Sequence, residues 1–385
     1  MAMTIAENGL LKIRGRERYL SLDVLRGLTI ALMVVVNTPG SWSAIYAPFK
    51  HAPWHGFTIT DWVFPSFLFV VGNAMSFSMI KMMQEKDKTF LKKVGKRTLI
   101  IFVIGLFLAA YPFFRMVEGE AVAFDFSRIR IMGVLQRIAL CYALAALVIY
   151  YFKGKGAIVF SFLALFGYWA VMYFFGDKGD PYSLTGNAAI KLDLFLIGPD
   201  NMYKGEGIPF DPEGLLSTFP ATVNVIGGFY IGKFIQRFGS NSSTVLKLIG
   251  MGLLLMAVSL LWDTVFPINK KIWTSSYVLL TVGLSTVVLA VLMYLIEVLQ
   301  VKKWTYFFVV FGRNPLLLYA LSGLVIKTMF IIRVDGKSLN GWIYQDLLQP
   351  IFSDMNASLF FALGYMLLIW MVGYIMDRRK IYIKV

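Results

Sequence analysis

The chain has 385 residues, of which 58% are hydrophobic and only 15% are charged, with a mean hydropathy of +0.69. Soluble domains are about 45–50% apolar and about 25% charged, so this composition excludes soluble, secreted, fibrous and disordered proteins and predicts a polytopic membrane protein. The net charge of +15 lies in short clusters between apolar runs, which is typical of topology-setting charge and argues against nucleic-acid binding. The single cysteine, Cys141, excludes an intrachain disulfide.

Apolar runs predict an all-α bundle of about ten membrane-spanning helices, since a helix needs roughly 20 apolar residues to cross the hydrocarbon core. The predicted spans are 21–38, 58–82, 97–115, 130–151, 157–175, 215–236, 245–263, 274–299, 304–332 and 357–376. The ninth contains Asn314-Pro315, and because proline lacks a backbone donor we expect a kink or a break there. Basic residues before the first span resemble the start of a signal peptide, but no small-residue cleavage site follows, so we expect a retained span.

Lysine and arginine set the orientation of these spans. With ten spans both termini lie on one side, and the short loops on that side are strongly basic, whereas the longer loops on the other side contain many acids. The positive-inside rule therefore predicts that both termini are cytoplasmic. We expect a cytoplasmic segment at 1–20, one transmembrane domain at 21–376 and a basic cytoplasmic tail at 377–385.

Three outer segments, 39–57, 176–214 and 333–356, are too long to be simple turns, and loops of this length are often functional. Segment 176–214 combines Gly, Pro, Asp and Asn with apolar anchors, so we expect an ordered cap over an outward-facing site. No internal repeat is visible, which disfavours a transporter built from inverted repeats.

The only two histidines, His51 and His55, lie in the first outer segment on either side of Trp54. Histidine is the natural proton acceptor near neutral pH, although an interfacial histidine can also simply hydrogen-bond among headgroups. Asp61 opens the second span, where either an orienting bond to an imidazole or a helix-capping role for Thr60 or Asp61 fits. Two histidines and one aspartate are a weak pattern for zinc, so we expect no metal.

Ionisable residues inside predicted spans are costly and mark a cavity, a partner or a polar path. Asp23 and Arg26 lie one turn apart in the first span, where they can simply pair with each other. Arg137 in the fourth span and Arg313 in the ninth have no acid on their own helix, so each needs a bound anion or an acid on another span.

A second outer cluster lies in the run IPFDPEGLLSTFPA at 208–221. Asp211 is placed to cap the sixth predicted span through its side-chain oxygen. The alternative is that Asp211 or Glu213 faces the site and holds a cationic or polyhydroxylated substrate. The residues themselves leave both interpretations open.

Several of these runs together resemble the heparan-α-glucosaminide N-acetyltransferase family. The runs are SLDVLRGLTIALMVVVN, FKHAPWHGFTITDWVFPSFLFVVG, LQRIALCY, FDPEGLLSTFPA, INKKIWTSSYV and FGRNPLLLYA, which extend over about 20–376. The histidine-bearing run, combined with FDPEG and NKxxWTxSY, is much more specific than LDxLRG alone. A family of acyltransferases that O-acetylate surface sugars shares an LDxLRG-like run, but it has a histidine at the end of its first span, where this chain has Asn37.

The resemblance implies a transmembrane enzyme that moves acetyl from cytosolic acetyl-CoA to the amino group of a terminal glucosamine. It places the key histidine at His51 and a site asparagine at Asn37. The animal enzymes have asparagine where this chain has His55, which leaves the role of His55 open. Animal members also have an outer domain and an extra span upstream, so we expect a bacterial member in the inner (cytoplasmic) membrane, with His51 near the periplasmic face.

In this interpretation His51 acts as a general base or as an acetyl carrier, and Asn37 donates to the oxyanion. Trp54, Arg137, Asp211 and Glu213 are the candidates for binding the acceptor sugar. The pantetheine arm would reach through the bundle, and its phosphates would bind basic groups near the inner face. The candidates for that role are Arg26, Lys96, Arg97 and Arg313.

Two questions stay open from the sequence alone. The competing function is an amino-sugar transporter or binding protein without acyl transfer, which would need no CoA site. The expected partners are acetyl-CoA, an amino sugar and the lipid bilayer, without nucleic acid. Membrane enzymes of this kind often dimerise through lipid-facing spans, so a homodimer is one alternative for the oligomeric state.

Overall fold

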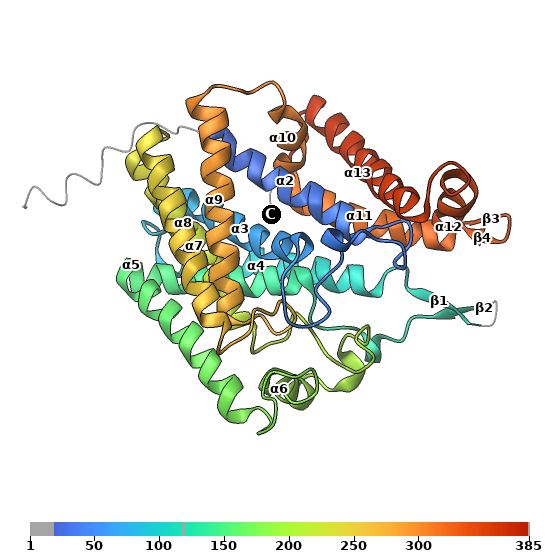
Figure 1. Cartoon of the computed structure of the whole chain (residues 1–385), viewed down its shortest axis with the longest axis horizontal. Helices are drawn as coiled ribbons and strands as arrows, with labels where there is room; N and C mark the ends of the chain where they lie inside the picture. Colours follow the sequence, from blue (N-terminus) through green and yellow to red (C-terminus); the bar gives the residue numbers. More distant parts are fainter. Residues whose placement is uncertain (1–18, 118–119, 384–385) are drawn as a thin grey trace, which may run out of the picture.

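The computed structural model describes residues 19–117 and 120–383, and these fold almost entirely into helices (Figure 1). The helices are α2 (Leu20–Asn37), α3 (Ile59–Met82), α4 (Asp87–Ala110), α5 (Val134–Phe175), α6 (Ala188–Leu196), α7 (Thr218–Phe238), α8 (Ser242–Asp263), α9 (Ser275–Met293), α10 (Thr305–Arg313), α11 (Pro315–Ile331), α12 (Leu339–Trp342) and α13 (Asp354–Arg378). Shorter helical turns are η1 (Ala47–Phe49), η2 (Phe126–Arg128), η3 (Pro199–Asn201), η4 (Tyr294–Val298) and η5 (Ile343–Leu348). The predicted basic N-terminal residues lie outside the described residues.

Two small antiparallel hairpins complete the described chain. Strands β1 (Phe114–Val117) and β2 (Glu120–Ala123) pair with Phe114 opposite Ala123. Strands β3 (Arg333–Val334) and β4 (Lys337–Ser338) pair with Arg333 opposite Ser338. Figure 1 shows the β1–β2 hairpin projecting from the end of the helices at the right of the view.

The prediction of a mostly helical membrane protein is confirmed. In the described part of the chain, six helices are long and apolar enough to cross a membrane, or seven if the bent pair α10–α11 counts as one span. Helices α4 and α7 occupy two further predicted spans but are not among the six. Lysines crowd the first half of α4, and α7 contains Thr, Asn, Gly and Gln, which lowers the hydropathy of both. The count of ten spans and the cytoplasmic location of the termini stay predictions.

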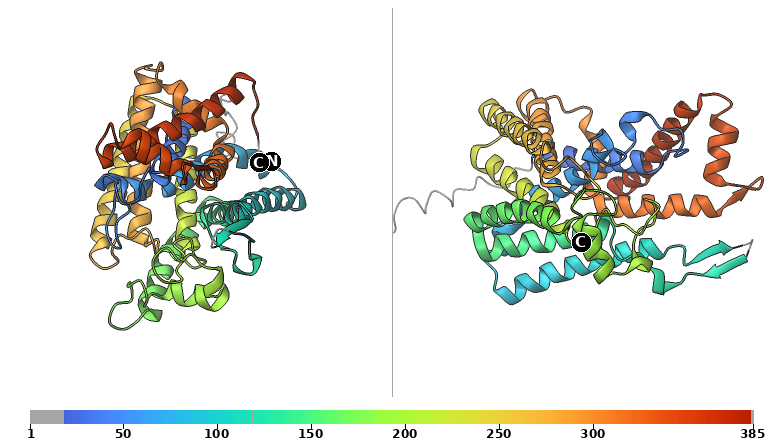
Figure 2. Two further views of the ribbon diagram at one scale, coloured as in Figure 1. Left: turned by 90° about the vertical axis from the view of Figure 1, so that its right-hand side faces the viewer. Right: turned by 60° about the horizontal axis from the view of Figure 1, so that its bottom comes forward.

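Two long helical segments are interrupted, one at a predicted boundary between spans and one at a predicted break within a span. The predicted spans 130–151 and 157–175 form the 42-residue α5, which is interrupted at Lys153 by a backbone with φ of 56°. Figures 1 and 2 show the second half of α5, with α6, at the opposite edge of the molecule from α13. The break expected at Asn314-Pro315 is confirmed, because α10 and α11 meet there at 84°.

Close helix contacts at glycines hold the centre of the bundle together. A Cβ on Gly228 of α7 would lie 1.9 Å from the carbonyl oxygen of Phe69 on α3, and a Cβ on Gly72 of α3 would lie 1.8 Å from that of Val225 on α7. Small residues let helix backbones approach in this way, which is how membrane helices gain van der Waals contact. The α3–α7 pair therefore forms a rigid support for the start of α3, where His51 and Asp61 meet.

The outer segment 176–214 is folded against the ends of the helices. It contains α6 and a small apolar cluster in which Phe210, Tyr182 and Ile190 are buried. Trp54 from the first outer loop joins this cluster, since its Nε1 donates to the carbonyl of Tyr182 at 2.9 Å and its ring packs edge-on against Phe210. The first outer loop, this segment and the turn between α8 and α9 thus meet at one end of α3 and α9.

Candidate functional site

The first turn of α3 is built around the carboxylate of Asp61. Thr58 is the N-cap of the helix, and its backbone N–H and hydroxyl donate to Asp61 Oδ2 at 3.1 Å and 3.0 Å. The backbone N–H of Ala52 donates to the same oxygen at 3.1 Å. Asp61 is thus the third residue of a capping box, and the cap is Thr58 rather than the predicted Thr60 or Asp61. One carboxylate oxygen fixes both the helix start and the loop that carries His51.

The other oxygen of Asp61 orients His51. Its Oδ1 lies 2.6 Å from His51 Nδ1, and the Asp61 side chain is only 1% exposed, whereas that of His51 is 39% exposed. A carboxylate in this position accepts a hydrogen bond from Nδ1–H and so leaves the lone pair of a neutral imidazole on Nε2. The predicted contact between Asp61 and an imidazole is confirmed, and the imidazole is that of His51.

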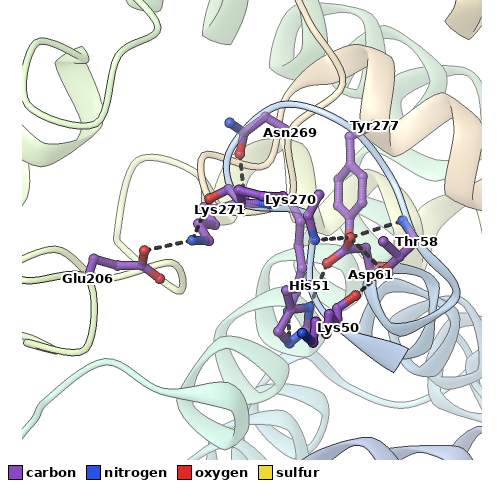
Figure 3. A network of polar contacts seen from close by, with 11 residues as sticks. Lys50, His51, Thr58, Asp61, Glu206, Asn269, Lys270, Lys271 and Tyr277 are labelled. Carbon is purple, nitrogen blue, oxygen red and sulfur yellow. Dashed lines mark hydrogen bonds and ion pairs between the residues drawn. The ribbon is translucent and has the colours of Figure 1, made fainter. Parts of the chain in front are cut away.

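Lys270 completes this group from the turn between α8 and α9 (Figure 3). Its Nζ lies 3.2 Å from His51 Nδ1 and 3.1 Å from His51 Nε2. Burial lowers the pKa of Lys270 below its ordinary value, although the negative charges of Glu213 and Asp61 act in the opposite direction. We call His51, Asp61 and Lys270 the histidine cluster.

Neighbouring residues hold this cluster in place. The Tyr277 hydroxyl, on α9, donates to the backbone carbonyl of Asp61 at 2.6 Å. Lys271 Nζ donates to the carbonyl of Pro53 at 2.8 Å and pairs with Glu206 at 2.6 Å, which joins the turn to both outer segments. Figure 3 shows these groups converging from several segments of the chain.

His55 lies apart from the histidine cluster. Its Nδ1 is 3.3 Å from the Nδ2 of Asn269, a buried residue. Burial lowers the pKa of His55, although the charges of Asp180 and Asp263 act to raise it. No contact joins His55 to His51 in the described part of the chain, so the two histidines have different surroundings.

An acidic group lies beside the histidine cluster. Arg130 Nη2 pairs with Asp211 at 2.5 Å and with Glu213 at 2.6 Å, and the Arg130 guanidinium lies over the ring of Tyr203. Asp211 also accepts from the backbone N–H of Tyr203 at 3.2 Å. The prediction that Asp211 caps the sixth span is wrong, because α7 begins at Thr218 and the Asp211 oxygens are taken by Arg130 and Tyr203.

The pKa values of Asp211 and Glu213 are shifted in opposite directions. Burial raises the pKa of Asp211, and the like charge of Glu213 adds to the effect. Burial alone would raise the pKa of Glu213, but the positive charges of Arg130, Arg137 and Lys270 outweigh it and lower that pKa. Glu213 is therefore the electrostatic link between Arg130 and the histidine cluster.

Arg137 holds the chain that follows Glu213. It is fully buried in α5, and its Nη2 donates to the carbonyl of Gly214 at 2.8 Å and to the Ser217 hydroxyl. Its guanidinium lies over the ring of Trp273, 4.8 Å from the centroid. The expected acid on another span is not in direct contact with Arg137 in the described chain, so these contacts favour a positioning role for Arg137.

Asp193 on α6 also contacts this segment. Its Oδ1 accepts from the backbone N–H of Leu215 at 2.9 Å, and a Cβ on Gly214 would lie 1.9 Å from its Oδ2. Burial raises the pKa of Asp193 to about 6, against the charge of Arg137 and the Leu215 hydrogen bond. Gly214 is therefore required by the close approach of Asp193.

The four candidates for binding the CoA phosphates differ in whether a carboxylate pairs with them. Arg26 pairs with Asp23 at 3.4 Å and donates to the carbonyl of Gly312 at 3.2 Å. Arg313 pairs with Asp377, the acid on another span that its position required. Lys96 is exposed. Arg97 lies over the ring of Tyr142, its Nε has no hydrogen-bond partner, and no carboxylate pairs with it among the described residues.

Two further predicted residues lie at the edge of the site. Asn37 is the last residue of α2 and is exposed, and no hydrogen bond joins it to His51 in the described structure. Trp54 packs against the folded cap as described above. No group of three or more His, Cys, Asp or Glu side chains in the described residues is arranged to hold a metal ion.

Comparison with known proteins finds sequence similarity to one family of enzymes. A family model described as heparan-alpha-glucosaminide N-acetyltransferase, catalytic, matches residues 18–196. The chain is similar in sequence to the heparan-α-glucosaminide N-acetyltransferases. The protein of that name from Homo sapiens is 27% identical over 355 residues, which cover 78% of this chain and 52% of the human one. The Mus musculus protein of the same name is 27% identical over 361 residues, covering 79% and 53%. The chain thus spans about half the length of the curated relatives it matches.

The predicted resemblance to the heparan-α-glucosaminide N-acetyltransferases is confirmed by these matches. The segment matched by the catalytic family model contains His51, Asp61 and Arg130, whereas Lys270 and Glu213 lie beyond it. The similarity to the human and mouse relatives extends over a longer part of the chain. The histidine cluster therefore combines residues inside and outside the matched catalytic segment.

Sequence reasoning missed three residues that contact the predicted site residues: Lys270, Arg130 and Thr58. Lys270 lies in the run INKKIWTSSYV, which carried part of the resemblance but received no role. Thr58 three residues before Asp61 matches the capping-box spacing, a signal that was available. Arg130 is the first residue of the predicted span 130–151 and belongs to no recognisable motif. Only the fold pairs it with residues about 80 positions away.

Proposed function

We propose that the protein is a transmembrane N-acetyltransferase that moves the acetyl group of acetyl-CoA to the amino group of a glucosamine-type sugar. The observation that carries this proposal is the 2.6 Å contact between His51 Nδ1 and the buried Asp61 carboxylate, within the segment matched by the catalytic family model. This arrangement gives a half-exposed imidazole with a fixed orientation, which is what a general base requires. The names of the relatives support the reaction type.

In the proposed reaction His51 Nε2 takes a proton from the acceptor ammonium, and the neutral amine attacks the thioester carbonyl carbon. The carbon–nitrogen bond forms while the carbonyl electron pair moves to oxygen. The carbon–sulfur bond then breaks, the second proton on nitrogen passes to the leaving sulfur, and His51 returns its proton to solvent. The products are the amide and the free thiol of CoA. In the rival route the His51 imidazole attacks first and carries the acetyl group.

The acidic group supports recognition of a cationic sugar. Glu213 is kept ionised by Arg130 and other cations, and its charge acts on Lys270 in the histidine cluster. A carboxylate here would attract the acceptor ammonium towards His51. Asn37 at the end of α2 is the proposed partner of the oxyanion by resemblance to the family.

On the inner side, Arg97 and Lys96 are the better candidates for the CoA phosphates. Arg26 and Arg313 already pair with Asp23 and Asp377. Arg97 has no carboxylate partner in the described chain and keeps an unpartnered Nε. The proposed orientation has the nucleotide at the cytoplasmic face of a bacterial inner membrane and His51 near the periplasmic face, with the pantetheine arm reaching across a large part of the ~30 Å core.

The direct test is acetyl transfer by the detergent-solubilised protein, with labelled acetyl-CoA and glucosamine. His51→Ala should reduce kcat by roughly 10²–10⁴-fold, the usual contribution of a general base. His55→Asn is the matched control and should stay within a few-fold of the wild type, because His55 contacts Asn269 and not the histidine cluster. Glucosamine binding without any acetyl transfer by the wild type would contradict the proposal and favour a sugar-binding or transport protein.

A further inference from the structure

Lys270 lies over the face of the His51 imidazole. Its Nζ is almost equidistant from the two ring nitrogens, at 3.2 Å and 3.1 Å. An in-plane position at equal distances from both nitrogens would overlap ring carbons, so the ammonium must lie out of the plane. With Nδ1 bonded to Asp61, the in-plane lone pair of Nε2 points elsewhere and can accept a proton from another molecule.

The backbone of Lys270 is held rigidly. The Oδ1 of the buried Asn269 accepts from the backbone N–H groups of Lys271 and Ile272, at 2.7 Å and 3.1 Å. The Asn269 N–H donates to the Thr274 hydroxyl at 3.0 Å. Trp273 has φ of 51°, a backbone conformation that is unfavourable for a large residue and persists only when its surroundings enforce it. The turn therefore holds Lys270 in one position.

Lys270 also differs from Lys271 in that no carboxylate of the described residues forms an ion pair with it. Lys271 forms an ion pair with Glu206, whereas no carboxylate of the described residues lies within ion-pair distance of Lys270. Glu213 and Asp61 are near enough to act on Lys270 through their charges but do not contact it. A partly buried ammonium without a carboxylate in contact is well placed to stabilise a negative charge that forms only during a reaction.

From this placement we infer that Lys270 is a catalytic residue that donates a hydrogen bond to the thioester carbonyl oxygen and stabilises the oxyanion. The inference rests on the proposed acetyl transfer. The attacking amine is hydrogen-bonded to His51 Nε2, so the carbonyl carbon that it attacks lies close to Nε2. Lys270 Nζ is 3.1 Å from Nε2 and therefore lies close to the same carbonyl group. The oxyanion would then lie between two positive charges, those of Lys270 and of the His51 imidazolium.

This is the role that the family resemblance gives to Asn37, and the contacts of the two residues differ. Asn37 is exposed at the end of α2 without a hydrogen bond to the described histidine cluster, whereas Lys270 already contacts it. An oxyanion donor contributes roughly 10²–10³-fold to kcat in other enzymes. If Lys270 is the principal donor, its loss should reduce kcat more than the loss of Asn37 does.

The test compares Lys270→Met, Lys270→Arg and Asn37→Ala with Lys191→Met as the matched control, since Lys191 pairs with Asp177 and has no contact with the histidine cluster in the described chain. Lys270→Met should reduce kcat by about 10²–10³-fold while the KM for acetyl-CoA changes by less than about threefold, because the hydrogen bond strengthens only in the transition state. Lys270→Arg retains charge and donors and should recover at least about tenfold of that loss. Lys191→Met should keep kcat within a few-fold of the wild type, and Asn37→Ala should reduce kcat less than Lys270→Met does.

A second measurement separates chemistry from structure. Diethyl pyrocarbonate acylates the free lone pair of an imidazole, so it should modify His51 at similar rates in the wild type and in Lys270→Met. If Lys270→Met does not fold, Lys270→Gln replaces it under the same criteria. Wild-type kcat in Lys270→Met, or an equal loss in Lys191→Met, would overturn the role of Lys270 alone. Absence of acetyl transfer by the wild type would overturn the proposed function and the role of Lys270 with it.

Discussion

Asp61→Asn should inactivate the protein without unfolding it. The wild-type carboxylate uses Oδ2 to accept from the Ala52 and Thr58 backbone N–H groups and Oδ1 to accept from His51 Nδ1. In the variant, the amide oxygen would take the place of Oδ2, because two buried N–H groups require an acceptor there. The amide NH₂ would then face His51 and donate to Nδ1, so the imidazole would have its hydrogen on Nε2. A protonated Nε2 cannot accept the acceptor's proton.

The magnitude follows from these contacts. Loss of general-base catalysis costs roughly 10²–10⁴-fold, and an asparagine that imposes the wrong tautomer on a catalytic histidine costs roughly 10⁴-fold in a serine protease. Stability should change little, since both N–H groups keep an acceptor. Asp61→Ala, in contrast, would leave the Ala52 and Thr58 N–H groups without an acceptor and lower the free energy of unfolding by about 1–3 kcal/mol for each group. Acetyl-transfer kinetics and thermal unfolding in detergent measure the two effects, and a kcat of Asp61→Asn above a tenth of the wild type would refute the reasoning.

Three further predictions concern stability and the second histidine. Burial raises the pKa of Asp193 to about 6, so the folded protein is stabilised by protonation of Asp193 and loses that contribution as the pH rises from about 4 to 6. Asp193→Asn should therefore unfold at a higher temperature than the wild type at pH 8 and at a similar one at pH 4; equal differences at both would contradict the assignment. Gly228→Ala should lower the free energy of unfolding by about 1–3 kcal/mol, because its Cβ would lie 1.9 Å from the Phe69 carbonyl oxygen. Gly167→Ala, with open space around it, should leave the free energy of unfolding unchanged or slightly higher in the same assay. His55→Asn should keep kcat within a few-fold at pH 6–8, and a loss as large as that of His51→Ala would transfer the base role to His55.

Hydropathy and local chemistry predicted much of the fold. The apolar runs located the long helices, and Asn314-Pro315 predicted the 84° break between α10 and α11, since proline cannot donate within a helix. The bend inside α5 at Lys153 was predicted only as a boundary between two spans. Helices α4 and α7 show the limit of hydropathy, because helices packed within a bundle can tolerate polar residues that lower their average.

The site was only partly predictable. His51 and Asp61 are ten residues apart on one loop and helix start, so an orienting bond from Asp61 to an imidazole was one of the two roles that the sequence indicated for Asp61. Lys270 reaches His51 across 219 positions, and Arg130 reaches Asp211 across 81 positions, distances over which no local pattern operates. For the same reason the sequence left open whether Asp211 caps a helix or faces the site, and did not indicate its pairing with Arg130. Long-range pairing of charges requires the fold.

The most direct test of the central claim is the sidedness of acetyl transfer in sealed proteoliposomes. Labelled acetyl-CoA is enclosed with the protein in the membrane, and glucosamine is added outside. The account predicts labelled N-acetylglucosamine in the outer medium with the wild type and with His55→Asn, and none with His51→Ala. Label that appears only when acetyl-CoA and glucosamine share one compartment would contradict transfer across the membrane.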